Sequence, residues 1–211
     1  MRDVKALHPY LQMLAEELVR RCEQRGLNIK ITDCVRTKAE QDASLKKGTT
    51  QVRYPFSYHA WGLAFDICKN SANVPYPQDI TWWNKVGQIG EELGLEWGGR
   101  WTDFVDRPHF QLTAYGTCSE LIGKYIAPYE FFAHKDYKVV TPKTPILPTS
   151  SKKKVLWLQV RLTIAGYKCT LDGEWGEQTQ AQLKKFWKDY TGKNCTGLVC
   201  SVKCIEMLDG Q

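Results

Sequence analysis

The sequence predicts two domains: an α+β domain with a small antiparallel sheet flanked by helices, and then a small all-α module of three helices. Its 211 residues are long for one small domain and suit two. Strand and helix patterns mix without a regular alternating repeat up to residue 138, whereas only helical patterns follow residue 154. We therefore expect domains at 1–138 and 155–211, separated by a linker at 139–154.

The first elements are a helix, a strand and a second helix. A strand is expected near residues 29–32, because Ile29 and Ile31 alternate with polar residues and lead toward Arg36. Thr37 to Glu40 has the form of a capping box, which predicts that a helix begins there. The helix before the strand is indicated by apolar side chains at helical spacing, closed by a glycine: Leu11, Leu14, Leu18, Cys22 and Gly26.

The second half of this domain again contains both strand and helix patterns. Apolar residues alternate from Leu63 to Ile67, which predicts a strand with Asp66 on the opposite face. A helical pattern from Trp83 to Leu93 ends at Gly94, and a short strand is expected over 109–112. Residues 117–120 form a second capping box and predict another helix.

Residues 139–154 have the composition of a linker, with three prolines, several hydroxyl residues and a run of lysines. Beyond them, apolar spacing predicts one helix over 155–165, and a Gly-containing turn at 172–176 precedes a second helix over 178–190. A third helix is expected over 200–208.

Charge and hydropathy exclude some classes of protein. The net charge of +6 is modest and fits an anionic polymer as well as many ordinary proteins. No run of about 18 apolar residues occurs, so no stable membrane insertion is expected. The N-terminus lacks the apolar core of a signal peptide. We expect no nucleic-acid partner and favour a monomer.

Eight cysteines are many for a chain without a Cys-x-x-Cys pair. The absence of that pair removes the usual signature of a structural zinc or redox site. We therefore expect free, partly buried thiols that pack as small hydrophobic groups, Cys68 among them. A disulfide among the four cysteines of the last 43 residues, or an additional metal site, remains the alternative.

Two fragments concentrate the chemistry of the chain. Ser57 to Asp66 reads Ser-Tyr-His-Ala-Trp-Gly-Leu-Ala-Phe-Asp, and Asp106 to His109 reads Asp-Arg-Pro-His. His59, Asp66 and His109 are ligand types that suit one zinc ion per chain, and three ligands leave a fourth position open, as in catalytic sites. The alternative is that the histidines are structural or lie at the surface, and we interpret His8 and His134, which lack such neighbours, as non-ligands.

The two fragments, in this order, resemble the zinc peptidases of bacterial cell walls that include D-Ala-D-Ala carboxypeptidases. The stretch from Glu96 to Phe110 is similar to one branch, the L-alanyl-D-glutamate endopeptidases, many of which are phage endolysins. The resemblance covers roughly residues 25–115. It implies the zinc ligands given above, a general base at Asp106 and cleavage of the L-Ala-D-Glu bond of wall stem peptides.

Asp106 and Arg36 are the two candidate catalytic residues. Asp106 would take a proton from the attacking water and pass it to the leaving amine; its alternative role is a turn or an ion pair with Arg107. Arg36 would face the oxyanion that develops in the tetrahedral intermediate, and its alternative is a surface arginine after a strand.

Substrate contacts are less specified by the sequence. Ser57 could hydrogen-bond substrate or orient a ligand. Trp97 and Trp101, together with Phe104, could form the wall of a substrate groove, although aromatic side chains at this density often fill a core instead.

The tail resembles the three-helix peptidoglycan-binding module. The matching positions are Leu158-Gln159, Leu162, Gly166-Tyr167, Asp172-Gly173, Gly176, Thr179 and Phe186. The resemblance implies attachment to the wall, and Tyr167, Trp175 and Trp187 are candidate wall-binding residues. The alternative is that these aromatic side chains belong to the core of the module.

Together these observations predict a two-domain, zinc-dependent peptidoglycan hydrolase that is endolysin-like and bacteriolytic. We expect synthesis in the bacterial cytoplasm without a signal peptide and action on the wall after release. A D,D-carboxypeptidase that trims terminal D-Ala is the nearest alternative. A zinc-stabilised wall-binding protein without catalysis is the alternative from another class.

Overall fold

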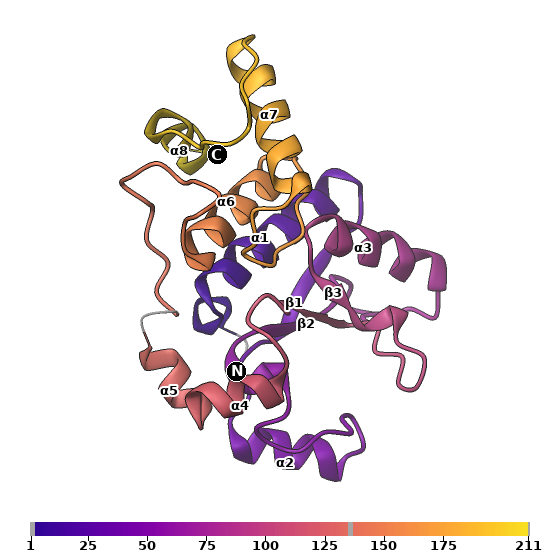
Figure 1. Cartoon of the computed structure of the whole chain (residues 1–211). Helices are drawn as coiled ribbons and strands as arrows, with labels where there is room; N and C mark the ends of the chain where they lie inside the picture. The colour runs from indigo at the N-terminus through magenta and orange to yellow at the C-terminus, as the bar shows by residue number, and fades with distance from the viewer. Residues whose placement is uncertain (1–2, 135–136, 211) are drawn as a thin grey trace. The chain divides into compact units, whose positions relative to one another are not determined.

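A computed structural model of the chain describes residues 3–134 and 137–210. Its contacts group into two compact units (Figure 1): Met1–Glu91 with Leu95–Lys138, and Glu92–Gly94 with Val139–Gln211. The first unit combines a sheet with helices, and the second is helical.

The first unit contains a four-stranded antiparallel sheet in the order β1-β2-β4-β3. Its strands are β1 (Ile29–Asp33), β2 (Ala64–Lys69), β3 (Glu96–Trp97) and β4 (His109–Gln111). The register of the central pair places Asp66 opposite His109 and Phe65 opposite Phe110. Because side chains alternate across a strand, one face carries the two polar residues and the other carries the two rings.

Helices surround this sheet in Figure 1. They are α1 (Pro9–Gln24), α2 (Lys38–Lys46), α3 (Ile80–Glu92), α4 (Cys118–Tyr125) and α5 (Pro128–Ala133), with short 3-10 helices η1 (Val4–Ala6), η2 (Tyr58–Trp61) and η3 (Gly98–Arg100). Both predicted capping boxes are present, at Thr37 before α2 and at Thr117 before α4. Sequence reasoning missed β3 and α5, which are two and six residues long.

The apolar face of the sheet packs against α3 through two glycines. A methyl group at Gly87 would lie 2.2 Å from the Trp97 ring, and one at Gly90 would lie 2.3 Å from the Phe110 ring. The Phe65, Phe110 and Trp97 rings form a stacked row, with centroid distances of 5.7 Å and 6.4 Å between neighbours. This close packing fixes the sheet, and with it the polar residues on the opposite face.

The second unit contains α6 (Lys152–Ile164), α7 (Glu177–Thr191) and α8 (Val202–Asp209). The structure differs from the expected linker at 139–154. Ile146 is fully buried and pairs with Cys200 as an isolated antiparallel bridge, and α6 begins within the lysine run. Composition does not reveal this packing, because a single buried isoleucine among prolines leaves no periodic pattern.

A buried glutamine organises the second unit. Gln159 Nε2 donates to Asp172 Oδ1 at 2.7 Å, to the Glu174 carbonyl at 3.0 Å and to Thr179 Oγ1 at 3.1 Å. Its Oε1 accepts from the backbone N–H groups of Asp172 and Gly173. We call these residues, Gln159 with 172–174 and Thr179, the Gln159 cluster, and every polar atom of its central amide is paired within the protein.

The described residues contain no disulfide. All eight cysteines are free, and only Cys195 is partly exposed. Burial raises the pKa of Cys22, Cys118 and Cys169 to about 12, which suits packed thiols rather than reactive thiolates. Within residues 3–134 and 137–210, no helix combines the length and the apolar composition needed to cross a membrane.

Candidate metal centre

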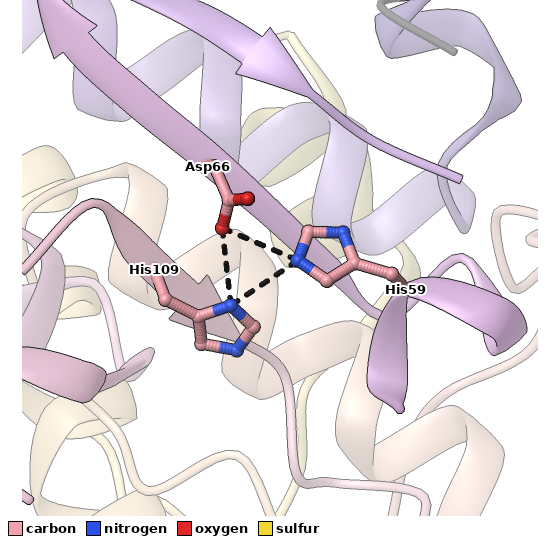
Figure 2. A group of neighbouring side chains, drawn as sticks. All are labelled: His59, Asp66 and His109. Atoms are coloured by element: carbon pink, nitrogen blue, oxygen red, sulfur yellow. Dashed lines mark hydrogen bonds and ion pairs between the residues drawn. The ribbon is translucent and has the colours of Figure 1, made fainter. Parts of the chain in front are cut away.

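His59, Asp66 and His109 come together at the polar face of the sheet (Figure 2). His59 Nε2 lies 3.2 Å from Asp66 Oδ1 and 3.2 Å from His109 Nδ1, and His109 Nδ1 lies 3.1 Å from Asp66 Oδ1. Three atoms with lone pairs thus form a nearly regular triangle. The structure brings together the three residues predicted as ligands.

Local structure explains how residues 59, 66 and 109 meet. Asp66 and His109 are cross-strand partners in the β2–β4 register. His59 lies in η2, whose C-cap is Gly62, in the left-handed region with φ of 65°. Glycine adopts that conformation without strain, so the chain can turn from η2 directly into β2.

A second hydrogen bond fixes each imidazole. His59 Nδ1 lies 2.6 Å from the Cys34 carbonyl, which can only accept, so Nδ1 carries the proton. His109 Nε2 lies 3.0 Å from Gln111 Oε1, which accepts its proton in the same way. The other nitrogen of each ring, His59 Nε2 or His109 Nδ1, therefore directs its lone pair toward a common point. The Asp66 carboxylate oxygen faces the same point.

This donor set fits a zinc ion. Two imidazole nitrogens and one carboxylate oxygen are common zinc ligands. Bonds of about 2.0–2.1 Å in tetrahedral geometry put ligand atoms roughly 3.3 Å apart, close to the observed edges of 3.1–3.2 Å. Three convergent acceptors would repel one another, so the arrangement calls for a cation, which is a metal ion or, in its absence, a proton on a facing ring nitrogen.

The neighbouring groups of the cluster overcome the effect of burial on its pKa values. Burial alone would raise the pKa of Asp66, but the charge of His59 and hydrogen bonds with both histidines hold it well below its usual value. Burial alone would lower the pKa of His109, but its hydrogen bond with Asp66 and the charges of Asp66 and Asp106 raise it. The carboxylate is thus ionised and available as a ligand.

Asp106 lies beside the triangle without being part of it. The Asp106 backbone N–H donates to the Gly98 carbonyl at 3.0 Å, and the His109 N–H donates to the Asp106 carbonyl at 3.2 Å. A methyl group at Gly98 would lie 2.5 Å from the Asp106 carbonyl oxygen, so glycine is required for this close approach. Burial raises the pKa of the Asp106 carboxyl, which has no hydrogen-bond partner among the described residues.

Arg36 is held over the site by two carboxylates. Its Nε donates to Asp33 Oδ2 at 2.5 Å, and one terminal nitrogen donates to Asp66 Oδ2 at 2.6 Å. The Arg36 backbone N–H donates to the His59 carbonyl at 3.2 Å. The second terminal nitrogen, Nη1, has no partner among the described residues.

A cavity of about 320 Å³ opens over the triangle. Ser57, Trp101 and Phe104 line it together with Arg36 and Asp106. The Ser57 hydroxyl has no hydrogen-bond partner in the described part of the chain, and the Trp101 ring lies 5.1 Å from the His109 ring.

Trp97 does not line this cavity. It is 1% exposed, and its indole N–H donates to the Arg107 carbonyl at 2.8 Å. The sequence could not separate it from Trp101, because only the strand register shows that Trp97 faces α3. Its place is in the core, where it supports the turn that carries Asp106.

Of the three aromatic residues predicted to bind the wall, one is buried and two are partly exposed. Tyr167 is buried, packs edge-on against Phe186 and donates its hydroxyl to Asp189 at 2.9 Å, so it belongs to the core of the second unit. Trp175 and Trp187 are partly exposed. These two remain candidates for contact with a wall polymer.

Sequence reasoning did not find the groups that orient the two histidines. Gln111 occupies an ordinary polar position at the end of a short strand. The group of Cys34 that orients His59 is its backbone carbonyl, which every residue has, so the sequence does not mark it. Gly98 is the one missed position with a visible signal, since a Gly-Gly pair before an Asp-x-Pro-His motif indicates close backbone approach.

Comparisons with known proteins agree with this geometry. The family described as D-alanyl-D-alanine carboxypeptidase matches residues 50–112. The chain is 31% identical to the peptidoglycan L-alanyl-D-glutamate endopeptidase CwlK of Bacillus subtilis over 122 residues, which cover 50% of this chain and 73% of CwlK.

A phage protein and a solved structure are also similar to the chain. The L-alanyl-D-glutamate peptidase of Listeria phage A118 is 30% identical over 128 residues, covering 59% of this chain but 44% of the phage protein. The solved L-Ala D-Glu endopeptidase ChiX of Serratia marcescens aligns with a TM-score of 0.45 and 24% identity, covering 52% of this chain and 83% of ChiX.

The fold and site define a metallopeptidase of the D-alanyl-D-alanine carboxypeptidase type. Within that group, the chain belongs to the family of L-alanyl-D-glutamate endopeptidases that includes CwlK.

Proposed function

We propose that this protein is a zinc-dependent peptidoglycan hydrolase that cleaves the L-Ala-D-Glu bond of wall stem peptides. One observation carries the proposal: two imidazoles and a carboxylate aim their lone pairs at one point, in a chain related to endopeptidases of that name. When bound, zinc supplies a Lewis acid and lowers the pKa of water at the open position to about 7.

Asp106 is the proposed general base. Its carboxylate has no partner among the described residues and lines the cavity over the triangle. Burial raises its pKa, which makes it a better proton acceptor than an exposed aspartate while leaving it able to release the proton to the leaving amine. Of the alternative roles, an ion pair with Arg107 is absent among the described residues, and the turn closed by the His109 N–H uses only the Asp106 backbone.

Arg36 is the proposed stabiliser of the oxyanion. Asp33 and Asp66 hold its guanidinium in place, so little reorganisation is needed as charge develops on the substrate carbonyl. Nη1 remains available to donate to that oxygen. Ser57 and Trp101 are the proposed substrate contacts in the same cavity.

The second unit is the proposed wall anchor, with Trp175 and Trp187 as contacts. Attachment raises the local concentration of substrate without adding a catalytic contact. An endolysin-like, bacteriolytic role, in which the protein is released from a producing cell and then degrades the wall, is part of this proposal. So is a monomeric state.

Digestion of purified peptidoglycan tests the reaction. Mass spectrometry of the products should show new N-terminal D-Glu on the stem peptides. Free D-Ala without new D-Glu termini would instead establish the D,D-carboxypeptidase alternative. Unchanged walls, with zinc bound, would establish the non-catalytic alternative.

Truncation after Lys138 tests the division of labour. The shortened chain keeps every proposed catalytic residue, so it should cleave soluble muropeptides at the rate of the full chain, provided that its thermal transition shows that it is folded. It should clear intact walls more slowly. Equal clearance by both proteins would contradict the anchoring role.

A further inference from the structure

Two cavities meet at Arg36 and Asp106, and their chemistry differs. The first, described above, has an apolar wall that includes Val52, Phe56 and Phe104. The second has a volume of about 680 Å³ and a polar wall. Arg36 and Asp106 line both, so a peptide that crosses the reacting centre would place one side in each cavity.

Lys47 is the cation without a partner in the polar cavity. Lys47 lines that cavity, and its ammonium group has no hydrogen bond or ion pair with any described residue. The other charged side chains that line the polar cavity already have partners within the protein or belong to the proposed reacting centre. Asp33 and Asp66 pair with Arg36, and Glu40 caps α2 by accepting from Thr37.

The segment that carries Lys47 is anchored to the fold. Lys47 is the C-cap of α2, and its N–H donates to the Ala43 carbonyl at 3.1 Å. The fully buried Gln41 donates to the Val52 carbonyl at 2.8 Å and to Thr50 Oγ1 at 3.3 Å. The helix and the following loop are thereby tied together, and Lys47 sits on a fixed wall rather than on a free loop.

The two sides of the proposed scissile bond differ in the same way as the two cavities. Alanine, on the N-terminal side of the scissile bond, is small and apolar. Glutamate, on the C-terminal side, has two carboxyl groups, and the peptide continues through only one of them. The residue after the scissile bond therefore presents a free carboxylate unless that group is amidated.

We propose that Lys47 is a specificity-determining residue that binds the free carboxylate of the acidic residue after the scissile bond. The polar cavity takes that residue, and the apolar cavity takes the alanine side. This inference rests on the proposed function. Binding of a carboxylate by a partly solvated ammonium contributes mainly to substrate affinity, so Lys47 should act on KM more than on kcat.

A matched pair of substrates tests the inference. One is a stem peptide with L-Ala followed by D-Glu, and the other carries D-isoglutamine, in which the free carboxylate is an amide. The zinc-loaded full chain should cleave the acid with a kcat/KM about fivefold higher than the amide, as expected for one partly exposed ion pair. Lys47→Met should lose this preference through a higher KM for the acid, and Lys47→Arg should keep it.

Lys46→Met is the control variant. Lys46 is the preceding residue, is exposed and lines neither cavity, so its replacement changes the net charge equally. It should retain the preference for the acid. Lys47→Glu should go further and favour the amide.

The inference is overturned if Lys47→Met keeps the preference, if Lys46→Met loses it equally, or if the unaltered protein cleaves both peptides with the same kcat/KM. Those results leave the proposed function intact. Failure of the unaltered protein to release new N-terminal residues from either peptide would instead overturn the proposed function itself.

Discussion

Two buried polar clusters in the described part of the chain differ in what they leave unpaired. In the Gln159 cluster of the second unit, the central amide meets both acceptors and donors, and all of them belong to the protein. In the candidate metal centre of the first unit, each imidazole uses one nitrogen for an orienting hydrogen bond and directs the other at a shared point. A carboxylate oxygen is aimed at the same point.

The comparison shows how a structural cluster is told from a functional one. A buried polar group without a partner costs free energy, so a completed network needs nothing more to be stable. Three acceptors that face one another are incomplete and need a cation. The difference cannot be read from residue types, since buried glutamines take part in both places.

The largest expected effect comes from removing a ligand. His59→Ala and His109→Ala should each lose bound zinc and reduce peptidoglycan cleavage to background, because the triangle no longer offers three metal ligands. Metal content by mass spectrometry and release of new termini are the measurements. His134→Ala, which changes a histidine outside the triangle, should retain both properties. Full activity in either ligand variant would show that the triangle is not the reacting centre.

Asp106→Asn should separate the base from the ligands. The variant should keep one zinc but lose roughly 100- to 10,000-fold in kcat, as expected when a general base is removed. Stopped assays on a soluble muropeptide measure the rate. Loss of zinc in this variant would mean that Asp106 is a ligand and that the carboxylates were assigned wrongly.

The two glutamines give the sharpest form of the comparison. Gln111→Leu removes the acceptor that orients His109, so zinc affinity should fall about 10- to 100-fold, as is typical for groups behind a ligand. Competition with a chelator measures this. The unfolding midpoint of the metal-free protein should change little. Unchanged zinc affinity would show that Gln111 does not fix the imidazole.

Gln159→Leu should have the opposite result and the smallest effect on activity. Backbone N–H groups of Asp172 and Gly173 lose their acceptor, so the second unit should be destabilised by about 1–3 kcal/mol. Denaturant unfolding followed by tryptophan fluorescence measures this change. Zinc affinity and cleavage of soluble muropeptides should match those of the unaltered protein. A loss of zinc would contradict the separation of the two clusters.

Much of the fold could be predicted because its signals are local. Both capping boxes lie where Thr and Glu are three residues apart, and the longer helices α1 and α3 show their apolar spacing. The six-residue α5 and the two-residue β3 are too short to show a period. Ile146 was placed in a linker because its buried pairing with Cys200 joins residues far apart in sequence.

The candidate site also has a part that the sequence predicts and a part that it does not. The three ligand types and their order were visible, since two motifs carry them. What holds them was not visible: the Cys34 carbonyl has no side-chain identity, and Gln111 looks like any polar strand residue. Trp97 and Trp101 give the same signal in the sequence, and the strand register together with the packing of Gly87 and Gly99 against the Trp97 ring shows that Trp97 is the core residue.

Zinc titration of metal-free protein tests the central claim most directly, namely that the acceptor triangle is a catalytic metal centre. The metal-free protein should not cleave a soluble L-Ala-D-Glu muropeptide. One equivalent of zinc should bind, raise the thermal midpoint of the first unit and restore cleavage in proportion to the zinc bound. Cleavage by metal-free protein at the full rate, or zinc binding that persists in His109→Ala with the same affinity, would contradict the claim.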